Sequence, residues 1–329
     1  MKVVPSLSKS IVLHGFYAIK GFDLLRFLRR RFISIVFYHR FSDRDEPFKL
    51  RVDRFERQIR FFKKKYNLVS LNQYVKALDG KCGLPDNPLI VTIDDGYWDN
   101  YHIAFPILRN HNVHATIFLA TDFVDKRAWL WSNKLEYILK NSKYERFSYQ
   151  LNGKVLDLKV DSFEQWHASQ LAIFNALRQR ADQEKDKILA DLAKHLRVTV
   201  PDETQGDFLP LSWEEVKTMH NSGIEFGSHS SSHAILSRVA PPDLPRELLG
   251  SKEKIEKAIQ EPVISFCYPN GQPGDYSNFV KQELSKAGYQ CAVTTIHGLN
   301  PPPPRSRPFE LKRFSVSAEY TLRLTRQLI

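Results

Sequence analysis

Apolar and polar residues follow two patterns along this chain, one typical of strands and one typical of helices. Short apolar runs predict buried parallel strands at residues 33–38, 89–93 and 114–119. Between these runs, apolar residues at helical spacing predict helices over about 53–66 and 98–112. Because strands that alternate with helices at this spacing pair in parallel, the pattern indicates an α/β fold.

The pattern changes after residue 125, and it predicts an α+β insertion at about 126–210. Alternating apolar residues on both sides of Asn152-Gly153 predict a β-hairpin, because this dipeptide favours tight hairpin turns. Residues 163–196 read as helical and charged, and we expect them to lie exposed on the surface. The alternation of strands and helices then resumes, with strands expected at 224–227, 263–267, 290–295 and 312–316.

The start of the chain is basic and amphipathic. Residues 11–32 place apolar side chains at helical spacing beside Lys and Arg, which predicts an N-terminal helix over 1–30 ahead of a folded domain at 31–329. Such a helix either binds a membrane surface or packs on the domain with its arginines solvated. No run reaches the about 18 apolar residues of a membrane span, and no cleavage site of a secretory signal follows. We therefore expect a cytoplasmic protein. If the helix binds a membrane, residues 11–32 would contact the inner face of the cytoplasmic membrane peripherally.

Composition narrows the classes of partner. The 329 residues include 48 Lys and Arg against 37 Asp and Glu, a formal net charge of +11, which favours anionic partners. The sequence has no RNA-binding signature, zinc-finger spacing or basic tail, so we expect no nucleic acid partner. Cys82, Cys267 and Cys291 form no Cys-x-x-Cys pair, which argues against a disulfide framework and suits a reducing compartment.

Two neighbouring carboxylates, Asp94 and Asp95, follow the strand expected at 89–93. The carboxyl ends of parallel strands form the edge at which α/β folds bind ligands. Gly96 lets the backbone turn directly afterwards, so both carboxylates can face one cleft. Asp-Asp-Gly is also an ordinary turn sequence, so this motif alone does not establish a site.

Two histidines, His229 and His233, follow the strand expected at 224–227. Spaced four residues apart, they would lie on one side of a helical turn and could bind one metal ion; a solvated serine-rich loop is the alternative. Together with one aspartate they would form a facial set that leaves metal positions open for water and substrate. The other aspartate would then be free to act as a general base.

Three motifs, in this order, resemble the polysaccharide deacetylase (NodB homology) superfamily, carbohydrate esterase family 4. They are Thr92-Ile93-Asp94-Asp95-Gly96, His229-Ser230-Ser231-Ser232-His233 and Phe266-Cys267-Tyr268-Pro269-Asn270-Gly271. With Tyr38-His39-Arg40 and residues 100–123, the resemblance covers nearly everything from 32 to 316 outside the insertion. It implies a distorted (β/α)7 barrel with an α+β insertion and the N-terminal amphipathic helix. It also implies metal-dependent hydrolysis of an N-acyl group, commonly N-acetyl, from an amino sugar of a bacterial polysaccharide or lipid-linked glycan.

The resemblance also implies a role for each matched position. Asp95, His229 and His233 would bind a divalent metal, most commonly zinc, and Asp94 would be the general base. A backbone N–H, here that of Asn270, would help to hold the oxyanion. The sugar site would be lined by Tyr268, Pro269, Asn270 and Gly271.

The sequence departs from the family pattern at two places. Cys267 stands where many members have an arginine that pairs with the base, and Arg313 is our candidate substitute, with an ordinary arginine at the barrel rim as the alternative. The late Leu-x-x-His motif that supplies the general acid is not evident. His39 and His297 are the candidates, and we favour His39 because the end of a strand aims a side chain more dependably than a Pro-rich loop.

These departures leave two alternative functions open. A barrel that has lost catalysis would bind glycans without turning them over. A sugar deformylase of the same superfamily would use the same metal site on a different acyl group.

Overall fold

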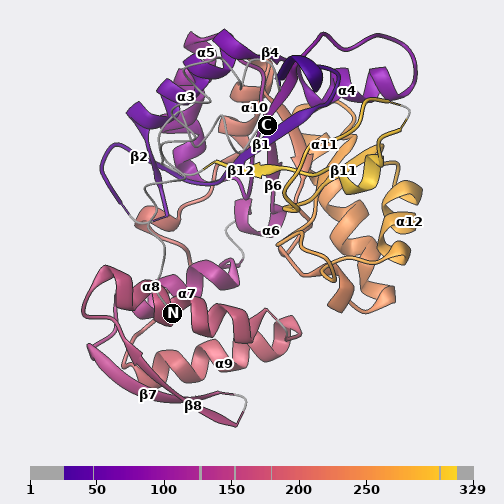
Figure 1. Cartoon of the computed structure of the whole chain (residues 1–329). Helices are drawn as coiled ribbons and strands as arrows, with labels where there is room; N and C mark the ends of the chain where they lie inside the picture. Colours follow the sequence, from indigo (N-terminus) through magenta and orange to yellow (C-terminus); the bar gives the residue numbers. More distant parts are fainter. Residues whose placement is uncertain are drawn as a thin grey trace, which may run out of the picture.

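The computed structural model describes residues 26–316, apart from 47, 126, 127, 152, 179 and 304. Its centre is a sheet of parallel strands with helices packed around it (Figure 1). The strands follow one another in the order β11, β10, β9, β6, β5, β1 and β12, and a short strand, β4, pairs with β5 beside this path. Their bounds are β1 Ser34–Tyr38, β4 Asn67–Leu68, β5 Pro88–Ile93, β6 Thr116–Leu119, β9 Glu225–Ser228, β10 Ser265–Cys267, β11 Cys291–Val293 and β12 Phe314–Ser315.

The sheet closes on itself through its last segment. Phe314 of β12 pairs with Val36 of β1, and Leu311, three residues earlier, makes a parallel bridge to Val293 of β11. The same short segment therefore contacts both ends of the strand path. Seven parallel strands thus surround one core, as the resemblance implies, and each of the predicted strands is present.

The register of the strands brings their carboxyl ends to one level. Tyr38 pairs with Ile93, and the N–H of Asp94 donates to the Tyr38 carbonyl at 2.9 Å. On the other side of β6, Leu119 pairs with Ser228. The residues that directly follow β1, β5 and β9 are therefore neighbours at the same edge, although the sequence separates them widely.

Helices cover the outside of the sheet, and their apolar faces explain why. The predicted helix at 53–66 is α3, which buries Phe55, Ile59 and Phe62 against the strands. The helix expected at 98–112 begins instead with a π-helical turn at Asn100–Ala104 before α5. The remaining bounds are α3 Val52–Lys65, α4 Leu71–Leu78, α5 Phe105–Asn110, α6 Thr121–Val124, α10 Trp213–Asn221, α11 Ser251–Ile259 and α12 Asn278–Lys286. Two short strands, β2 Phe41–Ser42 and β3 Leu50–Arg51, pair with each other. A second π-helical turn lies at Arg246–Gly250. The 3₁₀ turns lie at Gly206–Phe208, Leu236–Arg238, Pro241–Asp243 and Pro308–Glu310.

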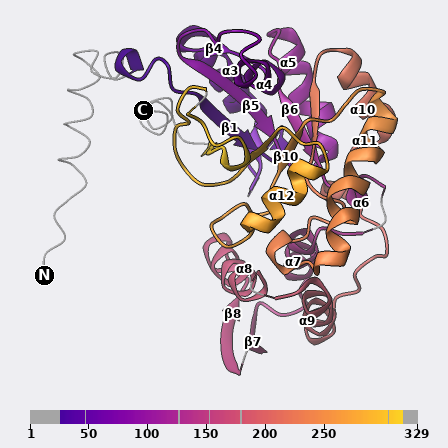
Figure 2. The same ribbon diagram turned by 90° about the vertical axis from the view of Figure 1, so that its right-hand side faces the viewer.

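The inserted segment packs around a small core of its own, below the barrel in Figure 1. Its elements are α7 Trp131–Lys140, β7 Arg146–Leu151, β8 Lys154–Lys159, α8 Phe163–Leu177 and α9 Asp182–His195. The predicted hairpin is present, since β7 and β8 are antiparallel with Leu151 opposite Lys154. Seen from the side, the hairpin and helices stay together as one group (Figure 2).

The prediction that residues 163–196 are helical is confirmed, but the prediction that they lie exposed on the surface is wrong. The run is two helices, and Ile173, Leu177, Leu189 and Leu192 on their inner faces are fully buried. The many charged residues of this segment occupy only the outer faces, and the overall composition hides the apolar stripe that packs against α7 and the hairpin.

The predicted N-terminal amphipathic helix lies mostly outside the described residues, which begin at residue 26. Among the helices from residue 26 onward, none combines the length and the apolar character needed to cross a bilayer.

Candidate metal and catalytic site

The first two site residues are held in a tight turn after β5. Asp95 has a φ of +77° and Gly96 a φ of +87°. A side chain at residue 96 would place its Cβ 2.6 Å from Cδ2 of Leu119, so this position requires glycine. The turn leaves both carboxylates nearly buried at the strand-end edge.

Asp95, His229 and His233 converge on one point. The Nε2 atom of each histidine lies 3.4 Å from Oδ1 of Asp95, and the potential ligand atoms of all three residues lie within 4.8 Å of one another. Donors bound to one zinc ion at about 2.0–2.2 Å in tetrahedral geometry lie roughly 3.4 Å apart, so the set fits such an ion. Oδ1 of Asp95 is buried and accepts no hydrogen bond from any residue that the structure describes, which is the state expected of a metal ligand.

The site holds the Asp95 carboxyl in the charge state that metal binding needs. Burial raises the pKa of the Asp95 carboxyl, but the two adjacent imidazoles outweigh it and hold this pKa well below its usual range. The Nδ1–H of His229 donates to the Cys267 carbonyl at 2.7 Å. In the neutral imidazole this bond leaves the lone pair on Nε2, the atom that faces Asp95.

The histidines lie in a loop rather than on the helical turn that the spacing predicted. Ser230 and His233 have φ values of +65° and +60°, which a right-handed helical turn excludes. Glu247, from the π-helical turn before α11, fixes this loop. Its carboxylate is 4% exposed and accepts from the N–H groups of Ser231 and Ser232 at 3.0 and 2.9 Å and from the Ser232 hydroxyl at 2.9 Å.

Arg313 holds Asp94 in a buried ion pair. The guanidinium is fully buried and donates to both carboxylate oxygens, with Nη1 2.8 Å from Oδ1 and Nη2 2.7 Å from Oδ2. Its donors also contact the Thr294 carbonyl, the Thr92 hydroxyl and the Cys267 sulfur. Its Cζ atom lies 4.4 Å from the centre of the Phe37 ring. Arg313 thus occupies the place on the carboxylate that the departure at Cys267 left open.

This pair sets the charge of Asp94. Burial raises the pKa of its carboxyl, but the charge and hydrogen bonds of Arg313 outweigh the burial, so the pKa is lowered. Burial raises the pKa of the Cys267 thiol, which therefore stays protonated and points at Oδ2 of Asp94 from 3.6 Å. Asp94 is accordingly an oriented carboxylate at neutral pH.

The two histidines considered as general acids differ in position. Nε2 of His39 lies 3.9 Å from Oδ2 of Asp94, and its side chain is 45% exposed, so it stands between the carboxylate and solvent. His297 is exposed and packs edge-on against Phe314 at 4.5 Å. The structure therefore brings His39, which directly follows strand β1 beside β5, close to the carboxylate of Asp94.

The motif at 268–271 forms the turn after β10. Tyr268 is buried, stacks on Tyr276 and donates its hydroxyl to the Phe309 carbonyl at 3.0 Å. Pro269 is also buried. The N–H of Gly271 closes the turn on the Pro269 carbonyl at 2.8 Å, and a Cβ at 271 would lie 2.8 Å from the backbone N of Thr295.

Asn270 stands at the head of this turn, with a φ of +60°. Its backbone N–H finds no hydrogen-bond acceptor in the part of the chain that the structure describes, and its Nδ2 is buried without a partner there. Backbone N–H groups in this state are the donors from which oxyanion sites are built.

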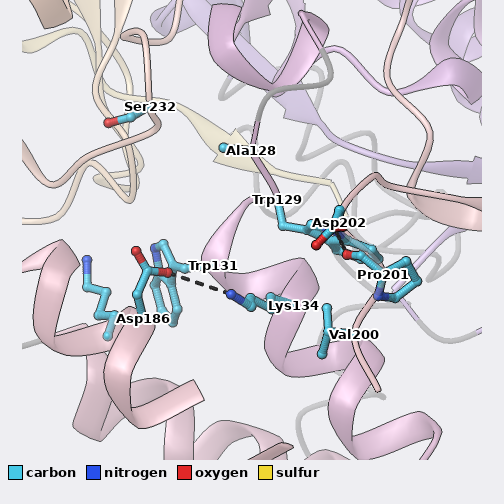
Figure 3. A pocket seen from close by; sticks show the side chains of 10 residues that line it. Ala128, Trp129, Trp131, Lys134, Asp186, Val200, Pro201, Asp202 and Ser232 are labelled. Atoms are coloured by element: carbon cyan, nitrogen blue, oxygen red, sulfur yellow. Dashed lines mark hydrogen bonds and ion pairs between the residues drawn. The ribbon is translucent and has the colours of Figure 1, made fainter. Parts of the chain in front are cut away.

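The insertion borders the site as well. A cavity of about 400 Å³ lies between α7, α9 and the histidine loop, where it reaches Ser232, the neighbour of His233 (Figure 3). Trp129 and Trp131 line it, and Lys134 faces Asp186 across it at 3.9 Å. Arg40 ties insertion and barrel together, because its guanidinium bonds the Glu136 carboxylate of α7.

A parallel barrel that carries a buried carboxylate with two histidines, beside a second oriented carboxylate, has the residue types that hydrolases of this fold class use. The sequence model of the polysaccharide deacetylase family matches residues 82–292, and the chain belongs to this family. Enzymes of the family are hydrolases that cleave the amide C–N bond of acetylated sugars. The resemblance stated from the motifs is confirmed.

Individual proteins similar to this chain in sequence or in structure are also polysaccharide or sugar deacetylases by their names. A putative polysaccharide deacetylase of Bacillus subtilis (strain 168), YxkH, is 21% identical over 210 residues, which are 64% of this chain and only 45% of that protein. The deacetylase PplD of Streptococcus pyogenes, solved in complex with acetate, aligns with a TM-score of 0.60 and 17% identity over 91% of this chain and 98% of its own. A de-N-acetylase from Aggregatibacter actinomycetemcomitans aligns with a TM-score of 0.58 and 15% identity over 91% of this chain and all of its own, 100%. These likenesses confirm the predicted α/β barrel fold.

Proposed function

We propose that this protein is a metal-dependent de-N-acylase that removes an N-acetyl group from an amino sugar of a bacterial polysaccharide or lipid-linked glycan. One observation carries the proposal: a carboxylate oriented by two hydrogen bonds from a buried arginine lies directly beside three converging metal-type ligands. A barrel that only binds glycans has no use for such a second carboxylate, and this favours catalysis over the binding alternative.

Asp95, His229 and His233 would hold the divalent metal, for which zinc fits the donor set best. The metal would supply a Lewis acid for the acyl carbonyl and for the attacking water. Asp94 would accept a proton from that water as its oxygen bonds to the acyl carbon. Arg313 keeps this carboxylate ionised and aimed, at the cost of some basicity, and its removal would leave the base misplaced.

The departing amine needs a proton when the C–N bond breaks. His39 would donate it, because its ring is exposed on the open side of the site and lies within 4 Å of Asp94, at 3.9 Å. The backbone N–H of Asn270 would donate to the carbonyl oxygen as negative charge develops there. The products would be acetate and a free sugar amine.

Residues 11–32 bear on where this reaction takes place. Their basic amphipathic pattern supports work in the cytoplasm with contact at the inner face of the cytoplasmic membrane, where lipid-linked glycans lie. Fractionation of the full chain and of a chain lacking residues 1–30 tests this, since equal amounts in the soluble fraction would contradict membrane contact.

The test of the activity combines metal analysis with an acetate-release assay. Wild type should contain one divalent metal per chain and release acetate from N-acetylated oligosaccharides until chelator is added. His233→Ala should lose metal and activity together, whereas Asp94→Asn should keep the metal and lose about 10²–10⁴-fold in rate. His114→Ala, an exposed histidine away from the site, serves as the matched control.

Other results would overturn parts of the assignment. Metal without acetate release, but with formate release from N-formyl sugars, would make the protein a deformylase. Metal with neither product would favour the glycan-binding barrel. Full turnover in Asp94→Asn would remove the base from the mechanism, and absence of metal from wild type would contradict the metal site.

A further inference from the structure

A groove opens beside the proposed catalytic centre, on the side of His39. It has a volume of about 760 Å³ and is walled by the end of β1, the loop between β2 and β3, and the start of α8 from the insertion. This volume lies within the range of about 300–1,000 Å³ that is typical of ligand sites. Because His39 lines the groove and also lies 3.9 Å from Asp94, the groove reaches the border of the proposed catalytic centre at His39.

Two exposed aromatic rings meet at the groove. Phe48 from the β2–β3 loop and Phe163 from α8 are 44% and 48% exposed, and their ring centres lie 6.3 Å apart. Phe48 also contacts the rings of Trp166 and His167, at 5.3 and 5.1 Å. Clustered aromatic rings that stay exposed on a soluble protein commonly mark a binding surface, since water contact with them is unfavourable.

The backbone of Phe48 is strained to hold this position. Its φ is +59°, a conformation that bulky side chains rarely adopt. The conformation turns the ring onto α8 rather than into the barrel core, so the barrel loop and the insertion together form one aromatic surface. Neither part would provide this surface alone.

The lysine and arginine side chains that line the groove each contact a carboxylate, and Arg40 contacts Glu136 at 3.2 Å. Arg54 contacts Asp45 at 3.1 Å, and Lys49 contacts Glu46 at 2.8 Å. Among the groove residues that the structure describes, every lysine and arginine therefore already has an anionic partner. These paired polar groups can still form hydrogen bonds with hydroxyl groups. A lipid chain would remove these ion pairs from water without offering them hydrogen bonds, and the desolvation of ion pairs is costly. Faces of sugar rings, apolar in the middle and hydroxylated at the rim, match both features.

We propose that Phe48 and Phe163 form a subsite that binds the uncharged sugar next to the one that is deacetylated. This subsite makes the insertion part of the substrate-binding wall and selects oligomeric over monomeric substrates. The inference rests on the proposed function, because the neighbouring sugar is defined relative to a reacting sugar at the metal site.

The first test compares substrates of different length. We would measure acetate release from N-acetylglucosamine, from its oligomers and from its octyl glycoside with full-length wild type and the double variant Phe48→Ala/Phe163→Ala. The double variant should raise KM for the oligomers about tenfold, which corresponds to about 1.4 kcal/mol, with little change in kcat. Its activity on the monosaccharide should be unchanged. Phe279→Ala, a 45% exposed phenylalanine on α12 outside the groove, is the matched control and should equal wild type throughout.

Three results would overturn the subsite. Equal kinetics of the double variant and wild type on all lengths would show that the rings do not contact substrate. Equal loss on monomer and oligomer would show that they act on the reacting centre or on folding. A loss confined to the octyl glycoside would show that the groove holds a lipid chain.

A binding measurement separates this proposal from the proposed function. Calorimetric titration of the oligomers into Asp94→Asn, with and without the two phenylalanine substitutions, reports on the subsite even without turnover. If wild type releases no acetate but the oligomers still bind and the substitutions weaken binding, the enzymatic proposal fails and the sugar subsite stands. If the oligomers bind equally in both proteins, the subsite fails.

Discussion

The ion pair between Arg313 and Asp94 should make a large contribution to the free energy of unfolding. A double-mutant cycle can measure the interaction between the two residues. Arg313→Met keeps much of the side-chain length but removes the charge and the two hydrogen bonds to the carboxylate, at 2.8 and 2.7 Å. Because both residues are at most 2% exposed, water cannot replace the lost partner. Breaking a buried pair from one side costs about 3–5 kcal/mol, a large part of the about 5–15 kcal/mol that stabilises a typical domain.

Asp94→Asn should destabilise for the converse reason, since it leaves the guanidinium without its counter-charge. The double variant Asp94→Asn/Arg313→Met buries neither charge. It should therefore be more stable than the sum of the single effects predicts, by about 2–3 kcal/mol. Urea unfolding in the presence of chelator, followed by circular dichroism, gives the four free energies of unfolding without a contribution from bound metal.

The control for this cycle is Arg307→Met. Arg307 is 86% exposed and contacts Glu310 at 3.5 Å, so its loss should cost at most about 1 kcal/mol. If Arg313→Met does not fold, Arg313→Lys replaces it, because lysine keeps the charge but lacks the two-pronged geometry. Additivity of the two single effects within about 0.5 kcal/mol would refute the reasoning, since it would mean that the two charges do not depend on each other.

Two further residues give independent predictions. Glu247→Gln should lower metal affinity about 10–100-fold, because it disturbs the loop that carries His233. Competition with a fluorescent chelator measures the affinity. The control is Glu253→Gln, on the exposed face of α11, which should match wild type. Burial raises the pKa of Asp99 to about 7, against the opposing charge of Arg40, whereas the unfolded carboxyl ionises near 3.8. The folded protein therefore holds a proton that the unfolded chain has lost, so this residue's contribution to stability falls as pH rises from about 3.8 to about 7. Between pH 5 and pH 8 wild type should lose about 3 kcal/mol relative to Asp99→Asn in urea unfolding, and parallel pH profiles of the two proteins would contradict the shifted pKa.

The strand-end chemistry could be predicted because its signals are local. An apolar run that ends in Asp94-Asp95-Gly96 predicts both the strand and the position of its polar end. The convergence of His229 and His233 was also predicted, but their backbone was not. Positive φ values at non-glycine residues depend on tertiary contacts such as those of Glu247, and nothing in its own helical run distinguishes that glutamate from a surface residue.

Contacts between distant segments were harder to predict. Arg313 and Asp94 are 219 residues apart, and only the closure of the sheet places them together; the sequence could offer this arginine as a candidate and no more. The groove between Phe48 and Phe163 has the same cause, because one residue lies in a barrel loop and the other in the insertion. The pattern of the insertion predicted its elements, and its packing followed from an apolar stripe that average composition conceals.

The closing segment of the sheet also has a consequence for biosynthesis. Asp94, Asp95 and both histidines leave the ribosome well before residues 311–315, which bridge β11 and β1 and carry Arg313. Until that segment docks, the nascent sheet has two open edges and the carboxylate that would act as base has no counter-charge. Unfinished or misfolded chains should therefore show no hydrolytic activity even if they bind metal. The docking of residues 311–315 both completes the sheet and brings Arg313 to Asp94.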